Sequence, residues 1–206
     1  MATKSVKIGA AVLVGALVVG IAVAAGRSSV DSPKKSAAQS TTTTVPGGLV
    51  EYRDDKAGWA ISYPKNWNRL QSQDTDVVLV LSEKPPELNN GGSILARNLT
   101  LATPVDEAKL QAAKEVTDKI VLSAEGVKLI TDTTVVHQGG LPGFFYFYSF
   151  KDLATGQEGV HTHYFLFKGS TMISFVFQAL PKDNFRALAD LFDEVIGSFR
   201  VLPPNG

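Results

Sequence analysis

The apolar and polar positions divide the chain into three parts. An unbroken apolar run fills residues 8–26, a Ser-, Thr- and Pro-rich stretch fills residues 27–47, and short apolar runs separated by turn residues fill residues 48–203. As a helix, the first run would be about 28 Å long, close to the thickness of the hydrocarbon core of a membrane. We therefore predict an N-terminal membrane segment at 1–26, a disordered linker at 27–47, and one folded domain at 48–203.

Two interpretations of residues 8–26 stay open. Lys4 and Lys7 precede the run, which favours a retained single-pass transmembrane helix with a cytoplasmic N-terminus. The triplet Ala22-Val23-Ala24 is also typical of a signal-peptide cleavage site, with removal before Ala25. Both interpretations place the domain outside the cytoplasm, either held at the cell membrane or secreted.

Within the domain, alternating apolar residues bounded by turn residues predict a series of strands. They are Leu49–Tyr52, Trp59–Tyr63, Val77–Leu81, Ile94–Leu101, Lys128–His137, Gly143–Phe150, Val160–Lys168, Met172–Leu180 and a short final strand, Phe199–Leu202. In the strand Gly143–Phe150, both alternating sets are aromatic. Apolar residues on both sides of a strand indicate that both faces of its sheet are covered.

Two helices are predicted to supply that cover. Thr103-Pro104-Val105-Asp106 is typical of a helix start, and a four-residue repeat follows at Ala108, Ala112, Val116 and Ile120. The second helix, Asp183–Ile196, carries one broad apolar stripe and ends before Gly197. The predicted fold class is α+β, with an antiparallel sheet sandwiched between helices.

Charge and cysteine content narrow the functional classes. Lys and Arg total 20, as do Asp and Glu, and the only adjacent basic pair, Lys34-Lys35, lies in the predicted linker. A chain without a clustered basic surface is not expected to bind nucleic acid. The chain has no Cys, which excludes disulfides, thiol catalysis, Cys-ligated metals and a lipoprotein anchor.

Three motifs resemble those of the PsbP/Mog1-like fold family and its bacterial relatives of unknown function. They are the opening Gly58-Trp59-Ala60-Ile61-Ser62-Tyr63-Pro64-Lys65-Asn66-Trp67, the turn Gly139-Gly140-Leu141-Pro142-Gly143 and the closing Phe192-Asp193-Glu194-Val195-Ile196-Gly197-Ser198-Phe199. The resemblance implies an α/β/α sandwich around an antiparallel sheet. It also implies a protein that binds other macromolecules rather than catalysing a reaction. Turn chemistry and packing account for the motif residues without a functional site.

Candidate chemistry is sparse. His161 and His163 share one face of a predicted strand, a spacing found in metal sites, and His137 could join them from a neighbouring strand. Asp54-Asp55, Asp74 and Asp76 are interpreted as solvated loop acids. Asn98 begins a glycosylation sequon inside a predicted strand, which we interpret as a chance match. No hydrolase, phosphate or dinucleotide motif occurs, so we expect no catalytic residue, no cofactor and no enzyme activity.

Two functional hypotheses follow. The first is a membrane-tethered interaction module outside the cytoplasm, attached through residues 8–26, that binds a protein or another envelope component. The alternative is an exported protein that binds a small ligand or a metal in a cleft beside the sheet, with His161 and His163 as the metal ligands.

Overall fold

The computed structural model describes residues 43–45, 48–85, 88 and 90–203. Its strands are β1 (Thr43–Val45), β2 (Leu49–Asp54), β3 (Trp59–Pro64), β4 (Asn68–Arg69), β5 (Val77–Ser82), β6 (Gly91–Val105), β7 (Lys128–Leu129), β8 (Thr134–Gln138), β9 (Leu141–Lys151), β10 (Glu158–Leu180) and β11 (Arg200–Val201). Its α-helices are α1 (Leu110–Leu122) and α2 (Phe185–Gly197), preceded by the 3-10 turns η1 (Glu107–Lys109) and η2 (Lys182–Asn184). In this part of the chain neither α-helix has the length and apolar character of a membrane span.

The predicted N-terminal segment 1–26 lies outside the described residues, as does most of the predicted linker. The end of that linker, however, is a strand. Thr43–Val45 forms β1, which pairs with β2 from Thr43↔Glu51 to Val45↔Leu49. The prediction of a disordered linker as far as residue 47 is therefore wrong for these three residues. Thr and Val favour extended backbone, and β1 satisfies backbone groups along one edge of β2.

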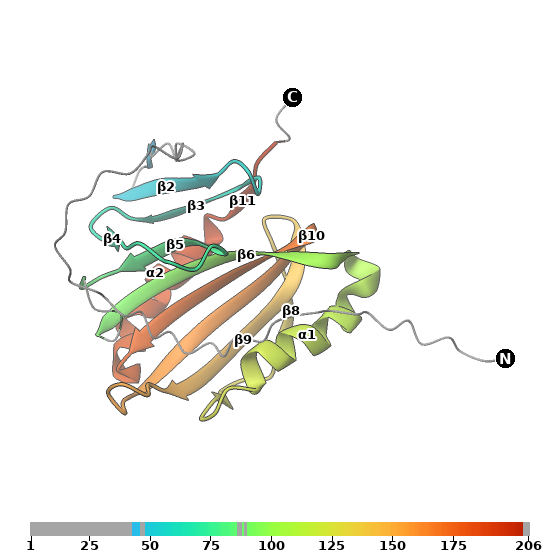
Figure 1. The fold of residues 1–206 in the computed structure, drawn as a ribbon. Helices are drawn as coiled ribbons and strands as arrows, with labels where there is room; N and C mark the ends of the chain where they lie inside the picture. The colour runs from blue at the N-terminus through green and yellow to red at the C-terminus, as the bar shows by residue number, and fades with distance from the viewer. Residues whose placement is uncertain (1–42, 46–47, 86–87, 89, 204–206) are drawn as a thin grey trace, which may run out of the picture.

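The strands form two antiparallel sheets where the sequence pattern predicted one (Figure 1). The large sheet has the order β4-β5-β6-β10-β9-β7, with β8 also pairing with β9, and the small sheet has the order β1-β2-β3-β11. The predicted α+β class and antiparallel pairing are confirmed, and the prediction of a single sheet is wrong. Periodicity identifies strands, but it does not show that β3 pairs with β11 from the far end of the domain.

β10 contains two of the predicted strands, joined by a reversal of the chain. Its first part pairs with β9 and its second part pairs with β6. Nε2 of His163 lies 2.7 Å from Oγ of Ser174, although these residues are 11 positions apart and would be separated by about 36 Å in a straight strand. Gly169, with a φ of 59°, suits the reversal. The predicted strands Val160–Lys168 and Met172–Leu180 are therefore confirmed.

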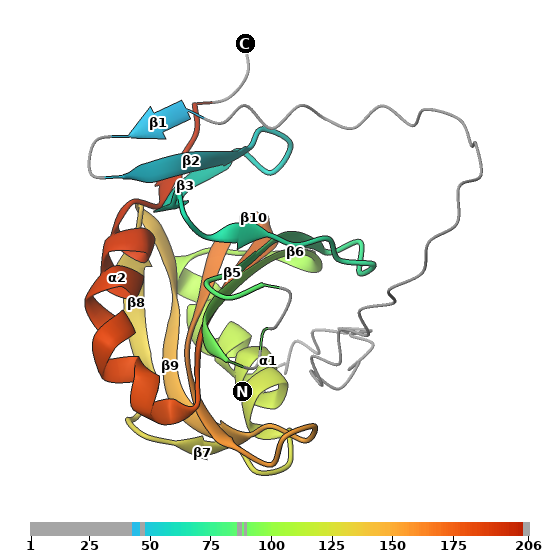
Figure 2. The ribbon, with the colours of Figure 1, turned by 90° about the vertical axis from the view of Figure 1, so that its left-hand side faces the viewer.

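α2 covers one face of the large sheet, over a core of aromatic and aliphatic side chains (Figure 2). Phe192 on this helix lies 5.3 Å from Phe177 and 6.4 Å from Trp67 between ring centroids. The predicted apolar stripe is confirmed in its most buried members, which are Leu188, Phe192, Val195 and Ile196. Burial of these large side chains is the main source of stability on this face.

α1 covers part of the opposite face, so the predicted burial on two sides is confirmed. Its predicted start is wrong, because residues 103–105 belong to β6. Asp106 caps the 3-10 turn η1 that leads into α1, and its Oδ1 accepts a hydrogen bond from the backbone N–H of Lys109 at 3.1 Å. The Thr-Pro pair is compatible with the end of a strand as well as with the start of a helix, and pairing between β6 and β10 decides between them.

The predicted buried face of α1 is confirmed only at Ile120, which packs against the core of this face. Ala108 and Ala112 are exposed, and the buried residues are Leu110, Ala113, Thr117 and Val121. Thr117 can occupy the apolar stripe because its hydroxyl lies 2.6 Å from the hydroxyl of Tyr146. This polar residue interrupts the stripe in the sequence, and the repeated Ala residues form a more regular but misleading pattern.

The predicted strand Lys128–His137 is split into β7 and β8. Both parts pair with β9, but Lys128 pairs with Ser149 and Thr134 pairs with Phe145, so two additional residues bulge out between them. Thr131-Asp132-Thr133 lies in this bulge, where short polar residues favour local turns. The prediction of one continuous strand is therefore wrong.

The three motifs meet in the structure. Trp59 is fully buried, with its ring centroid 5.2 Å from Phe175 and 6.1 Å from Phe199. Gly139 and Gly140 have φ values of 58° and 82°, as a two-residue type I′ turn between β8 and β9 requires. Gly139 also lies so close to the ring of Phe199 that a Cβ would collide with it. These motif residues build the junction between the two sheets.

Candidate functional site

A group of polar side chains lies within the sheet face that α1 partly covers. His161 and His163 project from β10 to the same side, as predicted, and both are buried. Ser174 and Gln178 come from the second part of β10, and Tyr148 comes from β9. We call these five residues the histidine cluster.

Every ring nitrogen in the histidine cluster has a hydrogen-bond partner. Nδ1 of His161 and Nδ1 of His163 lie 3.0 and 3.3 Å from the hydroxyl of Tyr148. Nε2 of His161 lies 2.8 Å from Oε1 of Gln178, and Nε2 of His163 lies 2.7 Å from Oγ of Ser174.

The directions of these hydrogen bonds follow from Gln178. Its Nε2 donates to the carbonyl of Leu88, so its Oε1 faces His161 and can only accept. Nε2 of neutral His161 therefore donates, and its Nδ1 accepts from the hydroxyl of Tyr148. The Tyr148 oxygen then accepts from Nδ1 of His163, whose Nε2 accepts from Ser174. All donors and acceptors match when both rings are neutral.

Burial keeps both rings neutral. It lowers the pKa of His161 from 6.5 to about 4. Burial is also the main reason that the pKa of His163 lies well below its usual value, and the nearby His161 and Arg97 lower it further. Burial raises the pKa of Tyr148, so its hydroxyl keeps its proton. The histidine cluster is therefore uncharged near neutral pH.

His137 does not join the histidine cluster. It lies exposed on β8, with its Nε2 3.0 Å from Oε2 of Glu107. Among the residues that the structure describes, no group of three or more His, Cys, Asp or Glu is placed to hold a metal ion. Metal binding by His161 and His163 stays a prediction, and it would require each ring to give up the hydrogen bond at the nitrogen that binds the metal.

A hollow lies beside the histidine cluster, over β5, β6 and β10. Its walls combine apolar and polar side chains, namely Val80, Leu88, Ser93, Ile94, Leu95, Arg97, His161, Val176 and Gln178. Arg97 is held by Asp74, with Nη2 and Oδ2 2.7 Å apart. Asp74 is therefore paired with a specific cation, which its interpretation as a solvated loop acid did not anticipate.

A second feature is a set of exposed apolar side chains on and near the free edge of the large sheet. In the described part of the chain, the exposed large apolar side chains are Leu122, Leu129, Ile130, Val135 and Leu153. The first four lie between the end of α1 and β8. Leu153 follows Lys151, which lies against Gly126 in the turn between α1 and β7. We call these five residues the apolar edge.

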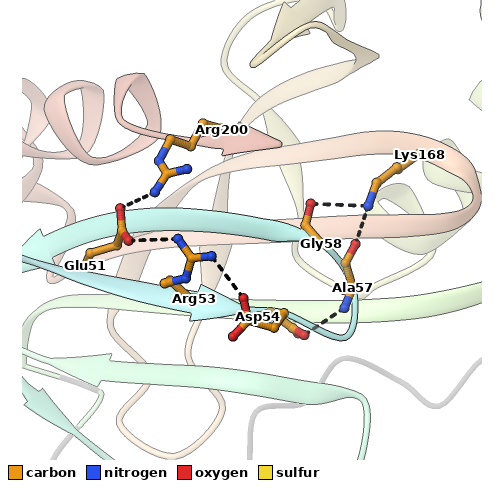
Figure 3. A network of polar contacts seen from close by, with 8 residues as sticks. Glu51, Arg53, Asp54, Ala57, Gly58, Lys168 and Arg200 are labelled. Carbon is orange, nitrogen blue, oxygen red and sulfur yellow. Dashed lines mark hydrogen bonds and ion pairs between the residues drawn. The ribbon is translucent and has the colours of Figure 1, made fainter. Parts of the chain in front are cut away.

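Charged and polar residues connect the small sheet to the large one. Lys168 of β10 makes this connection, because its Nζ donates to the carbonyls of Ala57 and Gly58 at 2.6 and 3.2 Å (Figure 3). Glu51 of β2 is paired with Arg53 of the same strand and with Arg200 of β11, so these ion pairs lie within the small sheet. The exposed ion pairs of this group contribute little to stability, because water screens them. The group is best explained as a structural connection.

Asn98 of β6 makes a second connection between the sheets. Its Nδ2 donates to Oδ2 of Asp54 at 2.6 Å, and its Oδ1 accepts from the indole N–H of Trp59 at 3.0 Å. A glycan on Nδ2 would break this arrangement, which agrees with the sequon being a chance match. Asp54 is likewise a structural partner rather than only a solvated acid.

Comparison with protein-family models and with curated proteins finds no match to this chain. Solved structures do match. Cyanobacterial PsbP (CyanoP) from Synechocystis has a TM-score of 0.53 at 15% identity, over 77% of this chain and 98% of that protein. The chain has the PsbP/Mog1-like fold.

Two other solved structures extend the likeness. LpqN of Mycobacterium tuberculosis, involved in cell envelope biogenesis, has a TM-score of 0.51 at 15% identity, over 80% of this chain and 91% of that one. The Ran-binding protein Mog1p of Saccharomyces cerevisiae has a TM-score of 0.50 at 15% identity, over 75% and 95%. This chain spans only 48% of a Bacteroides thetaiotaomicron protein that it matches at 11% identity and a TM-score of 0.51. Identities this low establish the fold alone.

Proposed function

We propose that this protein is a membrane-tethered, partner-binding module whose folded domain works outside the cytoplasm and catalyses no reaction. The apolar edge is the observation that carries the partner-binding part of the proposal. Several exposed large apolar side chains near one free sheet edge are typical of a surface where another protein binds. The apolar run 8–26 motivates the tether and the location.

The apolar edge favours a partner that presents an extended apolar segment. In the described part of the chain, β7 and β8 pair with β9 alone. Their outer sides therefore offer backbone N–H and C=O groups to an added strand, next to the exposed Val135. The bulge between β7 and β8 limits the length of regular edge, which protects the protein from unspecific strand pairing.

The fold neighbours support this proposal only in general terms. Mog1p is a Ran-binding protein, and LpqN is involved in cell envelope biogenesis. They are examples of the same fold in a partner-binding protein and in a protein involved in cell envelope biogenesis. We do not transfer either partner or process to this chain, because one fold serves unrelated functions.

A matched pair of substitutions tests the apolar edge. Val135→Asp places a charge on the edge, and Ala187→Asp places the same charge on the exposed side of α2, away from it. We expect Val135→Asp to abolish co-purification of a partner from envelope extracts and Ala187→Asp to preserve it. Equal retention by both variants, or no specific partner for the unchanged protein, would contradict the proposal.

The tether requires a separate test. Sequencing the N-terminus of the protein recovered from membranes distinguishes a chain that begins at Met1 or Ala2 from one that begins at Ala25. We expect the intact N-terminus in the membrane fraction, with the domain accessible to protease from the outer side. A diffusible protein that begins at Ala25 would show that the protein is secreted rather than tethered. A domain protected from external protease would contradict both the tethered and the secreted form.

A further inference from the structure

At β7, the apolar edge carries apolar side chains on one side of the sheet and charged side chains on the other. Leu129 of β7 lies opposite Tyr148, whose side chain belongs to the face that α1 partly covers. The preceding residue, Lys128, lies opposite Ser149, and successive residues of a strand point to opposite faces. Lys128 therefore projects towards the α2 face, as does Lys151, two residues beyond Ser149 on β9.

Lysines from three elements surround one glutamate at this end. Lys151 is the cross-strand partner of Glu158, and Nζ of Lys182, just before α2, lies 2.6 Å from Oε2 of Glu158. The hydrogen bond from Lys182 lowers the pKa of the Glu158 carboxyl, and the charge of Lys128 lowers it further. We call Lys128, Lys151 and Lys182 the lysine group. Figure 2 shows β7, the start of α2 and the β9–β10 connection at the end of the domain away from the small sheet.

The lysine group has positive charge available for a partner. Among the described residues, no carboxylate lies within ion-pair distance of Lys128 or Lys151, and both side chains are exposed. The exposed acids Glu125 and Asp132 lie outside β7, in the turn before it and in the bulge after it. Carboxylates of a bound segment would therefore be attracted to the α2 side of β7.

The backbone of β7 is open to another strand on its outer side. The N–H of Ile130 donates to the carbonyl of Phe147 at 2.8 Å, so the backbone groups of Ile130 face β9. Because this direction alternates along an antiparallel strand, the N–H and C=O of Leu129 face outwards. A strand added there would place one set of its side chains beside Leu129 and the alternate set beside Lys128.

We propose that the partner at the apolar edge presents an extended segment in which apolar and acidic residues alternate, with apolar residues against Leu129 and carboxylates beside Lys128 and Lys151. The inference rests on the proposed binding of a partner at the apolar edge, and it adds the chemistry of the bound segment. Charges at the rim of an interface mainly select the partner and speed its association, and salt screens them. A segment with basic residues in the same places is repelled.

Two peptides of opposite charge test the inference on the full-length protein in a non-ionic detergent. The peptide Glu-Val-Glu-Val-Glu-Val-Glu has the proposed alternation, and Lys-Val-Lys-Val-Lys-Val-Lys has the same apolar residues with the opposite charge. Fluorescence anisotropy of the labelled peptides measures binding. We expect the acidic peptide to bind at least about tenfold more tightly at low salt, and this preference to disappear in about 1 M sodium chloride.

Charge reversal assigns the preference to the lysine group. Lys128→Glu combined with Lys151→Glu should reverse it, so that the basic peptide binds more tightly. Lys56→Glu combined with Lys65→Glu makes the same change of net charge beside the small sheet and should leave the preference as it was. All four positions are exposed, so both variants are expected to fold. Equal binding of the two peptides to the unchanged protein, or a reversal in both double variants, would overturn the inference.

Failure of this inference is distinguishable from failure of the proposed function. Co-purification of a partner that depends on Val135, together with equal binding of the two peptides, would keep the partner site and overturn the alternation of apolar and acidic residues. Binding of neither peptide to the unchanged protein would also overturn the alternation, whatever partner co-purifies.

Discussion

The two faces of the large sheet differ in how completely they are closed. The α2 face holds a continuous apolar core that includes Trp59, Phe175, Phe177 and Phe192 and also reaches the small sheet. The α1 face holds a smaller apolar core, and beside it lie the histidine cluster and the hollow. The difference indicates that the α2 face mainly stabilises the fold, whereas the α1 face has polar groups and space that stability alone does not require.

The largest expected effect comes from opening the closed face. Phe192→Ala removes a ring that contacts Trp67, Phe177 and Phe185. Because the site is fully packed, we expect a loss of about 3–5 kcal/mol in the free energy of unfolding. Urea denaturation measures it. A loss below about 1 kcal/mol would show that the α2 face is less closely packed than the structure indicates.

Acid should weaken the α1 face through the histidine cluster. The folded-state pKa of His161 is lowered to about 4 from 6.5, so the unfolded chain binds the proton more readily. The stabilisation is complete above about pH 6.5 and is lost as the pH falls towards 4, by about 3 kcal/mol for this residue. Urea denaturation across this range measures the slope.

The His161→Gln variant is the control for this pH dependence. Glutamine cannot take up a proton in this range, so the part of the pH dependence of the unfolding free energy that comes from His161 should disappear. This comparison of slopes holds even if the variant is less stable at neutral pH. A slope identical to that of the unchanged protein would show that His161 is not the buried neutral group described above.

A smaller effect is expected at the connection between the sheets. Asn98→Ala removes the acceptor of the buried Trp59 indole N–H and the donor to Asp54. We expect a loss of about 2 kcal/mol, mainly because the indole is left without a partner. Thermal unfolding followed by tryptophan fluorescence measures it, and an unchanged midpoint would mean that water replaces Asn98 without cost.

The smallest effect on stability is expected at the apolar edge. Val135 is 55% exposed, so Val135→Asp should change the free energy of unfolding by no more than about 0.5 kcal/mol, similar to Ala187→Asp on α2. Urea denaturation of both variants checks this. A large loss for Val135→Asp alone would make the apolar edge part of the core and remove the argument that it binds a partner.

Much of the fold could be predicted from local patterns. The alternating aromatic residues of Gly143–Phe150 predicted burial on two sides, and the stripe on the second helix predicted its buried face. The errors arose where long-range contacts decide the outcome. Pairing with β10 extends β6 through Pro104, and the hydroxyl of Tyr146 allows Thr117 into the buried face of α1.

The candidate sites were less predictable. His161 and His163 were found from their spacing. Their ring nitrogens, however, are hydrogen-bonded to Tyr148, Ser174 and Gln178, and the last two come into reach only because the chain reverses within β10. Arg97 gave no signal in the sequence, because a single Arg in a strand is usually a solvated residue. Its place beside the histidine cluster and its pairing with Asp74 are visible only in the three-dimensional structure.

The central claim is that the apolar edge contacts a protein partner, and crosslinking in intact cells tests it most directly. A photo-reactive amino acid is placed at Val135 in one strain and at Ala187 in another. The account predicts a discrete crosslinked product from position 135 and none from position 187. No product at position 135, or the same products from both positions, would contradict it.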